Sequence, residues 1–291
     1  MKKALILAGG GARGAFQIGV WKYLAEKNWK PDIICGSSVG AINAAGIGSG
    51  LDIKKLVGIW TTYNRRRMYR LNLPEFLAYA LFGRELKPLL DAGGVESMLR
   101  EYIDFQHLRN NRMKIVVSTV NVHTARPCFF DNSEIQMEHI LASGAMPVLF
   151  SCQNIKGEPH WDGGIMSNIP LLPALEFGAE QIIIVMLSPV GHSPHPFPGD
   201  VRTALEHVFE QFLSASYQTA LLSRAYEDRC LPTSLPEYRK NGYTAKQPEI
   251  ICLAPAKMLG FSSLLNFSLR QAESLIDEGY KTACSRLKPF I

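Results

Sequence analysis

The sequence predicts an α/β fold of three layers, in which helices cover both faces of a mostly parallel central sheet. Short runs rich in Ile, Val and Leu recur along the 291 residues, and segments with a helical spacing of apolar residues lie between them. Strands that alternate with helices in this way pair in parallel and are covered on both faces. Hydrophobic residues make up 47% of the chain and charged residues 20%, as is typical of a globular protein with a substantial core.

Each expected strand is a short apolar or β-branched run. Residues 4–8 (ALILA) end in glycine, as a buried parallel strand often does, and the later runs have the same character. In chain order we expect strands at residues 4–8, 32–35, 114–120, 181–187 and 250–254.

The expected helices fill the segments between these strands. Residues 15–27 carry apolar side chains at a helical period, and Pro31 follows where that helix must have ended. We expect helices at residues 15–27, 41–50, 201–230 and 267–287, a tight turn at 36–40 and a Pro-rich loop at 188–200.

The organisation predicted from these elements is one domain over residues 1–291. The chain contains no internal repeat. The motifs described below fall within about residues 4–190, and we expect residues 191–291 to form a C-terminal extension of helices and a strand that packs on that part.

Composition narrows the class of protein and its compartment. The net charge of +5 is modest and no nucleic-acid-binding motif is present, so we expect no nucleic-acid partner. The six cysteines are scattered without a C-x-x-C pair, which favours free thiols in a reducing compartment. No apolar run approaches the roughly 18 residues of a membrane-spanning helix, and the run before the first glycines is too short for a signal peptide. We therefore expect a cytoplasmic protein.

The glycine-rich turn after the first strand has two interpretations. Gly9, Gly11 and Gly14 spell G-x-G-x-x-G, the pattern of a loop that binds a dinucleotide pyrophosphate. That interpretation needs an acidic residue at the end of the second strand, about 20 residues further on. Here Asp32 lies at the start of the strand and the next acid is Asp52, so we expect no dinucleotide cofactor. The alternative is a loop whose amides stabilise an oxyanion.

The second strand runs into a candidate nucleophile elbow. Gly36, Ser38 and Gly40 form G-x-S-x-G between a strand and a helix, which exposes the serine oxygen at the carboxyl edge of the sheet. Alone, the motif is compatible with an ordinary turn of small residues. A neighbouring strand that ends in three glycines would supply backbone donors for a tetrahedral oxyanion, so each motif supports the other.

A serine nucleophile also needs a base, for which Asp162 is the first candidate. It precedes Gly163 and Gly164, which allow a tight turn, although an Asp-Gly pair is more often a solvent-facing hairpin turn. A conventional triad would add a later histidine, and the candidates are His192, His195 and His207. His160 would face the same side of an extended segment as Asp162 and border the site, but it is a weaker candidate for the base.

Taken together, these motifs resemble the patatin-like phospholipase family. The resemblance rests on G-G-G-A-R-G (9–14), G-S-S-V-G (36–40) and D-G-G (162–164), in that order. Further stretches agree with the family, namely ASGAMPVLF (142–150), SNIP (167–170) and, for bacterial members, residues 264–280. The resemblance implies a patatin-like α/β fold in which a Ser–Asp dyad without histidine hydrolyses acyl esters of lipids.

The resemblance also implies roles for single residues. Ser38 would be the nucleophile and Asp162 the base, and the amides of Gly10 and Gly11 would form an oxyanion hole. Arg13 would belong to that hole, either by supporting the loop or by contacting the lipid phosphate. The remaining motif glycines are Gly9, Gly14, Gly36, Gly40, Gly163 and Gly164.

Some positions depart from the family pattern without removing a reacting group. Ala8 stands where relatives often carry Ser or Asp, and Ser37 and Val39 replace the commoner Thr and Ala beside the nucleophile. Trp161, directly before Asp162, is bulkier than usual and bears on the shape of an acyl pocket.

A basic segment separates the elbow from the strand at 114–120. Residues 61–70 carry Arg65, Arg66, Arg67 and Arg70 without an acid, and the apolar residues 71–82 follow. This combination suits peripheral contact with an anionic membrane, at the inner membrane surface, with the arginines on phosphates. The apolar residues expected to enter the lipid are Phe76, Leu77, Tyr79, Leu81 and Phe82. The other interpretation is a solvated basic turn that leads into a core-packed helix.

We therefore expect a serine hydrolase, a lipid acyl hydrolase of the phospholipase A or lysophospholipase type. It would cleave phospholipids or related acyl esters through an acyl-enzyme intermediate, without a metal or other cofactor. One alternative is a thioesterase or general carboxylesterase that uses the same dyad. The other is a lipid-binding protein that keeps the fold without turnover.

Overall fold

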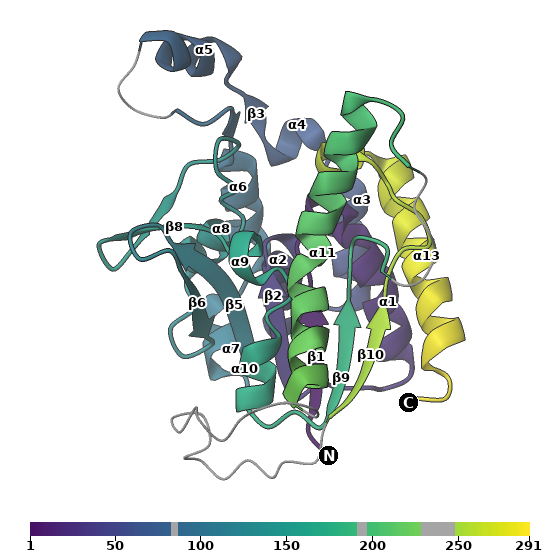
Figure 1. Cartoon of the computed structure of the whole chain (residues 1–291). Coiled ribbons are helices and arrows are strands. Elements are labelled where there is room, and N and C mark those ends of the chain that lie inside the picture. Colours follow the sequence, from purple (N-terminus) through teal and green to yellow (C-terminus); the bar gives the residue numbers. More distant parts are fainter. Residues whose placement is uncertain (83–86, 191–196, 228–247) are drawn as a thin grey trace.

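A mixed, mostly parallel eight-stranded sheet forms the centre of the protein (Figure 1). The computed structural model describes residues 1–82, 87–190, 197–227 and 248–291. The strand order is β10-β9-β1-β2-β5-β8-β7, and β6 pairs with β5. The parallel strands are β1 (Lys3–Leu7), β2 (Ile33–Ser37), β5 (Lys114–Asn121), β9 (Gln181–Val185) and β10 (Glu249–Leu253). The antiparallel strands are β6 (Arg126–Asp131), β7 (Gln153–Ile155) and β8 (Glu158–Asp162).

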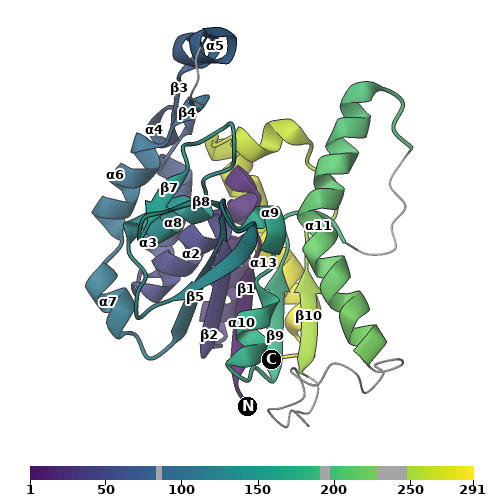
Figure 2. The same cartoon turned by 60° about the vertical axis from the view of Figure 1, so that its left-hand side comes forward.

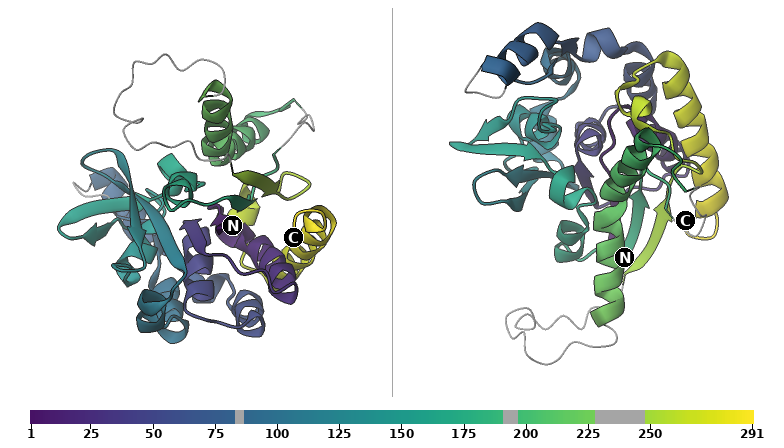
Figure 3. Two further views of the ribbon diagram at one scale, coloured as in Figure 1. Left: turned by 90° about the horizontal axis from the view of Figure 1, so that it is seen from below. Right: turned by 45° about the horizontal axis from the view of Figure 1, so that its top comes forward.

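Helices cover both faces of the sheet, so the predicted three-layer α/β class is confirmed (Figures 1 and 3). Side chains alternate along β1: Leu5 and Leu7 enter the larger core, whereas Ala4 and Ile6 enter the other. Facing the larger core are α1 (Ala15–Glu26), α2 (Val39–Gly48), α3 (Ile53–Thr62), α6 (Gly93–Tyr102), α7 (Phe105–Asn110), α8 (Met137–Ser143) and α13 (Leu269–Leu287). On the other face lie α9 (Gly164–Ser167), α10 (Leu171–Glu176) and α11 (Val201–Glu227).

The segment between α3 and α6 projects from one end of the molecule (Figure 2). It contains the short helix α4 (Arg65–Met68), the helix α5 (Leu73–Phe82) and a small antiparallel sheet of β3 (Arg70–Leu71) and β4 (Leu90–Asp91). Two 3₁₀ turns, η1 (Gly11–Gly14) and η2 (Phe261–Leu265), complete the described elements.

The expected elements agree with the structure within one to three residues in the described part of the chain. The predicted long helix at 201–230 is α11, which is described as far as Glu227, and residues 191–196 of the expected Pro-rich loop lie outside the described residues. The antiparallel strands β6, β7 and β8 were not predicted, because they are short and only partly buried and lack a clear apolar run. Across the described residues, no helix combines the length and the apolar character needed to cross a bilayer.

The C-terminal helix α13 packs against α1 with backbone in contact with backbone. A Cβ added at Gly19 on α1 would collide with the carbonyl oxygen of Ile276, and one added at Gly279 on α13 would collide with that of Phe16. The two glycines therefore allow a close approach that no larger residue permits. This crossing attaches the end of the chain to the helix that follows the glycine-rich turn.

We expect Gly279→Ala to lower the free energy of unfolding by about 1–3 kcal/mol, because the methyl group overpacks a backbone contact. The matched control is Gly58→Ala on α3, where an added Cβ meets nothing within 4 Å. That variant should be neutral or more stable by up to about 1 kcal/mol, since alanine is the better helix former. Urea unfolding of the three proteins measures both values, and equal effects of the two substitutions would contradict the proposed packing.

Candidate active site

Ser38 lies in a strained turn between β2 and α2. Its backbone has φ 52° and ψ −124°, a conformation that costs free energy for any residue other than glycine. The strain turns the side chain out of the sheet at the carboxyl end of β2, where it is only partly buried. The predicted elbow therefore has the expected geometry.

The glycines on either side of the elbow allow three backbone segments to meet. A Cβ at Gly36 would collide with the carbonyl of Gly40, and a Cβ at Gly40 would collide with the carbonyl of Leu7 at the end of β1. The turn can therefore close on itself and lie against β1 only if both positions are glycine. This contact explains the spacing of G-x-S-x-G in physical terms.

The ends of β2 and β8 meet on one edge of β5. On this edge β2 pairs with β5 as far as Ser37, opposite Ser118, and β8 arrives from the other direction and ends at Asp162, opposite Thr119. β6 takes the other edge over the same part of β5. Because β2 and β8 run toward each other at neighbouring positions, Ser38 and Asp162 come together at the point where the two strands end.

The hydroxyl of Ser38 donates a hydrogen bond to Oδ2 of Asp162 at 2.7 Å. The other carboxylate oxygen, Oδ1, accepts from the amide of Gly164 at 2.7 Å, and the amide of Asp162 donates to the carbonyl of Ala145 at 3.0 Å. Asp162 is 1% exposed, so the alternative of a solvent-facing Asp-Gly turn is wrong. Both oxygens and the backbone of Asp162 are thus held in place.

Burial raises the pKa of Asp162 from 3.8 to about 7, although the hydrogen bonds from Ser38 and Gly164 act in the opposite direction. Removal of water penalises the charged carboxylate more than these two donors stabilise it. A group with a pKa near neutral pH can accept and return a proton with little driving force lost in either direction. The chemistry available to this pair is therefore proton transfer from the serine hydroxyl.

Of the four histidines considered for the site, His160 and His207 lie in the described part of the chain. His160 is buried and its Nδ1 is 2.9 Å from the hydroxyl of Thr119, so it borders Asp162 as expected without binding it. His207 lies on α11. His192 and His195 are outside the described residues.

The glycine-rich turn lies directly beside Ser38. The amide of Gly9 donates to Oδ1 of Asn168 at 2.9 Å, and a Cβ at Gly9 would lie 2.9 Å from the Cβ of Ser38. Gly10 and Gly11 have φ values of 154° and 58°, which residues other than glycine rarely adopt. Within the described part of the chain, the amides of Gly10 and Gly11 donate to no acceptor, so both can serve as donors to a bound group.

The remaining motif glycines are also in close contact with their surroundings. Gly14 lies against Val39 and Trp60, and Gly163 lies against Ser118. Gly164 provides the amide that binds Asp162. Each of these positions faces a neighbour that leaves no ordinary space for a Cβ.

Arg13 is a buried support of the turn and does not line the cavity beside Ser38. Its guanidinium binds Glu210 through two nitrogens, at 2.6 and 3.0 Å, and its Nε donates to the hydroxyl of Ser263 at 2.7 Å. The carbonyls of Leu187 and Gly260 accept from it as well. Of the two roles expected for Arg13, these contacts agree with support of the loop, and they leave its donors occupied by protein partners rather than available to a lipid phosphate.

Two further side chains position the site and were not assigned a role from the sequence. The buried hydroxyl of Ser143 accepts from the amide of Ser38 at 2.9 Å. Asn168 holds Gly9 through Oδ1 and donates from Nδ2 to the carbonyl of Leu213 on α11 at 2.7 Å. The only sequence signal was that both lie in the stretches 142–150 and 167–170, which resemble the family.

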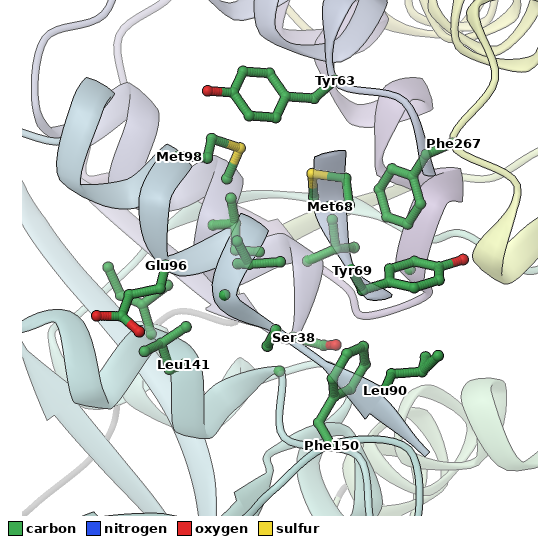
Figure 4. A pocket seen from close by; sticks show the side chains of 18 of the residues that line it. Ser38, Tyr63, Met68, Tyr69, Leu90, Glu96, Met98, Leu141, Phe150 and Phe267 are labelled. Carbon is green, nitrogen blue, oxygen red and sulfur yellow. The ribbon is translucent and has the colours of Figure 1, made fainter. Parts of the chain in front are cut away.

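Ser38 opens onto a cavity of about 440 Å³, a size typical of small-molecule sites (Figure 4). One face of α2 lines it with Val39, Ile42 and Gly46, spaced as one face of a helix requires. Across from α2, the lining comes from the projecting segment, from α6 and from around η2, through Tyr63, Met68, Tyr69, Leu90, Met98, Leu265 and Phe267. Asn43, Asp91 and Glu96 are among the polar exceptions. Trp161 is not part of the lining, so its bulk leaves this cavity unchanged.

Among the described residues, no group of three or more His, Cys, Asp or Glu side chains is arranged to hold a metal ion.

The turn that carries G-x-G-x-x-G is packed from one side by η2, since a Cβ at Gly11 would collide with the carbonyl of Leu264.

Comparison with known proteins identifies relatives of this arrangement. A family model described as patatin-like phospholipase matches residues 5–175. The cGAMP-activated phospholipase of Pseudomonas aeruginosa is 26% identical over 193 residues, which cover 61% of this chain and 56% of that protein. The lysophospholipase nte1 of Aspergillus terreus is 27% identical over 183 residues, which cover 62% of this chain and 12% of that protein. The chain thus spans only part of the length of these relatives.

Among solved structures, VipD from Legionella pneumophila is similar in fold. Its TM-score is 0.51 at 16% sequence identity, and the match covers 99% of this chain and 67% of that chain. At this identity the likeness concerns the fold alone.

We expect the stability of the wild type relative to Asp162→Asn to fall as pH rises from about 4 to about 7. The folded-state pKa of Asp162, about 7, exceeds its ordinary value of 3.8, so the folded protein binds the extra proton in this window. The stabilisation is complete below the lower value and is lost as pH rises through the upper one, by on the order of 4 kcal/mol.

Denaturant unfolding of both proteins across this range measures the difference. Ser38→Ala is the control, because it removes a hydrogen bond that lowers the pKa of Asp162 and should move the upper end of the window to higher pH. Parallel stability curves for the wild type and Asp162→Asn would show that Asp162 does not titrate in this window.

Proposed function

Because the chain belongs to the patatin-like phospholipase family, we propose that it is a serine hydrolase that cleaves acyl esters of lipids, with Ser38 as nucleophile and Asp162 as base. The observation that carries the proposal is the 2.7 Å hydrogen bond from the Ser38 hydroxyl to a buried carboxylate, at the wall of an apolar cavity. The names of the curated relatives, a phospholipase and a lysophospholipase, favour a phospholipid or lysophospholipid as substrate.

The first half of the reaction acylates the serine. Asp162 takes the proton of the Ser38 hydroxyl, and the oxygen attacks the carbonyl carbon of the ester. The carbonyl oxygen becomes an oxyanion, to which the free amides of Gly10 and Gly11 donate. Loss of one such donor typically costs about 3–4 kcal/mol of transition-state stabilisation, so the shape of the glycine turn matters to the rate. Acylation is complete when the C–O bond to the leaving alcohol breaks and this oxygen takes the proton held by Asp162.

The second half of the reaction regenerates the enzyme. Water gives a proton to the same carboxylate and attacks the acyl-serine. The fatty acid leaves, and the proton returns to Ser38. A single carboxylate with a pKa of about 7 serves as base and acid in both halves.

The cavity suits an acyl chain rather than a polar group. Its walls are mainly aliphatic and aromatic side chains, and it begins at Ser38 and continues along α2 to Gly46. Each methylene buried in such a site contributes about 0.8 kcal/mol of binding free energy. The acyl half of a lipid would therefore lie in the cavity and its head group toward the opening.

Contact with an anionic membrane is part of the proposal. Arg65, Arg66, Arg67 and Arg70 are exposed on or beside α4. Leu77 on α5 is 48% exposed, whereas Phe76 is only partly exposed. The side chains of Tyr79, Leu81 and Phe82, also expected to enter the lipid, lie outside the described part. Met68 and Tyr69, buried between the arginines, pack on the body and hold the basic segment at the edge of the cavity.

We expect Asp162→Asn to lower kcat/KM for phospholipid and for a short acyl ester by at least about 10³-fold, because the amide cannot take the proton of Ser38. The wild-type rate should rise with pH through about 7, as the carboxylate deprotonates. Release of fatty acid, followed by titration or mass spectrometry, measures both, and a comparison with acyl-CoA separates lipid hydrolysis from thioesterase activity.

Labelling with a fluorophosphonate probe tests the nucleophile independently. The probe should label the wild type at Ser38, and it should not label Ser38→Ala. Alanine at His160, His192, His195 or His207 should change kcat/KM by less than about tenfold, since the proposed dyad needs no imidazole. A loss of about 10³-fold at one of these histidines would replace the dyad with a triad.

We expect replacement of Arg65, Arg66 and Arg67 by Ser to weaken binding to phosphatidylglycerol vesicles by at least about tenfold, because each arginine near an anionic surface contributes about 1 kcal/mol. The matched control replaces Lys30, Arg109 and Arg112, exposed cations near the amino ends of β2 and β5, by Ser. Vesicle co-sedimentation measures both. Equal losses in the two variants would mean that only net charge matters.

A further inference from the structure

The helix α11 carries an apolar stripe on its outer surface. Val201, Leu205, Val208 and Phe212 are 78%, 56%, 63% and 36% exposed. Their spacing of four, three and four residues aligns them on one side of the helix, and we call them the α11 stripe. A surface helix normally turns such a face to the core, and contiguous exposed apolar surface marks a contact site.

The other side of α11 is what holds the helix to the protein. Glu210 is 6% exposed and forms the ion pair with Arg13, and Leu213 is 3% exposed, with its carbonyl bound by Asn168. The inner face of the first half of α11 is therefore held to the protein by these two buried polar contacts. The helix cannot rotate to bury the stripe without breaking them.

The α11 stripe lies at the same end of the molecule as the cavity. The helix starts beyond the carboxyl ends of the parallel strands and runs back along the sheet, so its first half shares this end with α4 and α5 (Figures 1 and 2). On α5 and the strand before it, Leu71, Leu73 and Leu77 are 54%, 42% and 48% exposed. Two separate apolar projections thus stand at the end that carries Ser38.

The turn η2 joins the α11 stripe to the cavity. The ring of Phe209 on α11 lies 5.0 Å from the ring of Phe261 and 6.1 Å from that of Phe212, measured between centroids. Phe261 begins η2 and is 39% exposed, while Leu264 and Leu265 in the same turn line the cavity. Apolar surface therefore continues from the outer face of α11 to the cavity wall within one turn of chain.

The charges around these apolar groups indicate which occupant fits. The arginines of α4 are exposed on one side of the cavity, and on the other side Arg202, beside the first residue of the stripe, has a side chain that is 79% exposed and pairs with Glu206 at 3.4 Å. Asp200 is also exposed there, so the positive charge at this end comes chiefly from α4. Cations that flank inserted apolar side chains match anionic head groups above an acyl layer. A second copy of the chain docked at this end would bring the α4 arginines of both copies together, and the net charge of +5 adds to that repulsion.

We propose that the α11 stripe enters the surface of an anionic phospholipid bilayer together with α5, on two sides of the cavity, and so holds the cavity opening against the lipid layer. This inference rests on the proposed function for its choice of lipid. It adds α11, which lies outside the basic segment, as a second membrane contact. It also sets the orientation of the protein on the bilayer, with the carboxyl edge of the sheet facing the membrane.

The test is vesicle binding by a stripe variant in which turnover has been removed. In a Ser38→Ala background, the double substitution Leu205→Gln and Val208→Gln should weaken binding to phosphatidylglycerol–phosphatidylcholine vesicles by about tenfold or more. The matched control is Leu172→Gln on α10, which is also exposed, at 45%, but lies near the opposite end of the sheet (Figure 1). It should bind as the parent does. Binding of the double variant equal to that of the control would overturn the proposal.

Two further measurements keep the outcome interpretable. Circular dichroism and urea unfolding show whether the double variant retains α11, and with Ser38 intact its turnover of a water-soluble short-chain ester should stay within about twofold of wild type. Vesicle binding without any ester turnover in the wild type would remove the proposed function and leave the docking surface. Ester turnover without stripe-dependent binding would do the reverse.

A second copy as the occupant is excluded or established by sedimentation without lipid. The wild type should be of the same oligomeric state as the double variant. A wild-type dimer that the double substitution converts to a monomer would assign the stripe to self-association and overturn the bilayer proposal.

Discussion

The hydrogen bond between Ser38 and Asp162 depends on the carboxylate being kept away from water. A solvated aspartate has a pKa near 3.8 and is a weak base, whereas this one, at 1% exposure, has a pKa of about 7. Histidine has an ordinary pKa near 6.5, so burial gives Asp162 the proton affinity that an imidazole has without help. Two features keep water away from the carboxylate: the end of β8 places it in the interior, and the glycines close the backbone around it. The amide of Gly164 holds the carboxylate in place but lowers its pKa.

Two buried polar contacts connect the glycine turn beside this pair to the rest of the chain. Asn168 links Gly9 to α11, and Arg13 links the same turn to α11 and to η2. Removing one partner of a buried ion pair typically costs about 3–5 kcal/mol, because the remaining charge is left without water or a counter-ion. The proposed oxyanion donors are therefore held in place by residues from the last third of the chain.

Local patterns allowed much of the fold to be predicted from the sequence. The strand at the start of the chain, the strand before Ser38 and the long helix α11 follow from apolar runs and helical spacing, and the elbow follows from three residues in a row of five. The antiparallel strand β8 could not be predicted, because its place is set by a free stretch of the β5 edge rather than by its own residues. The same limit applies to the site: the partner of Arg13 is 197 positions away, and no local pattern indicates that Ser143 binds the amide of Ser38. Residues within a local motif, such as Ser38 between its glycines or Asp162 before Gly163 and Gly164, could be assigned a role, whereas buried partners without a motif could not.

The Arg13 cluster has a consequence for the order in which the protein can become complete. The guanidinium precedes its partners by a long stretch of chain, since Ser263 lies 250 positions and Gly260 lies 247 positions further on. Contacts of such long range form late in folding, since the intervening chain must first be ordered. A nascent chain therefore carries its glycine turn without this support until Gly260 and Ser263 have been synthesised. A product that stops before η2 lacks the contacts that hold the proposed oxyanion donors.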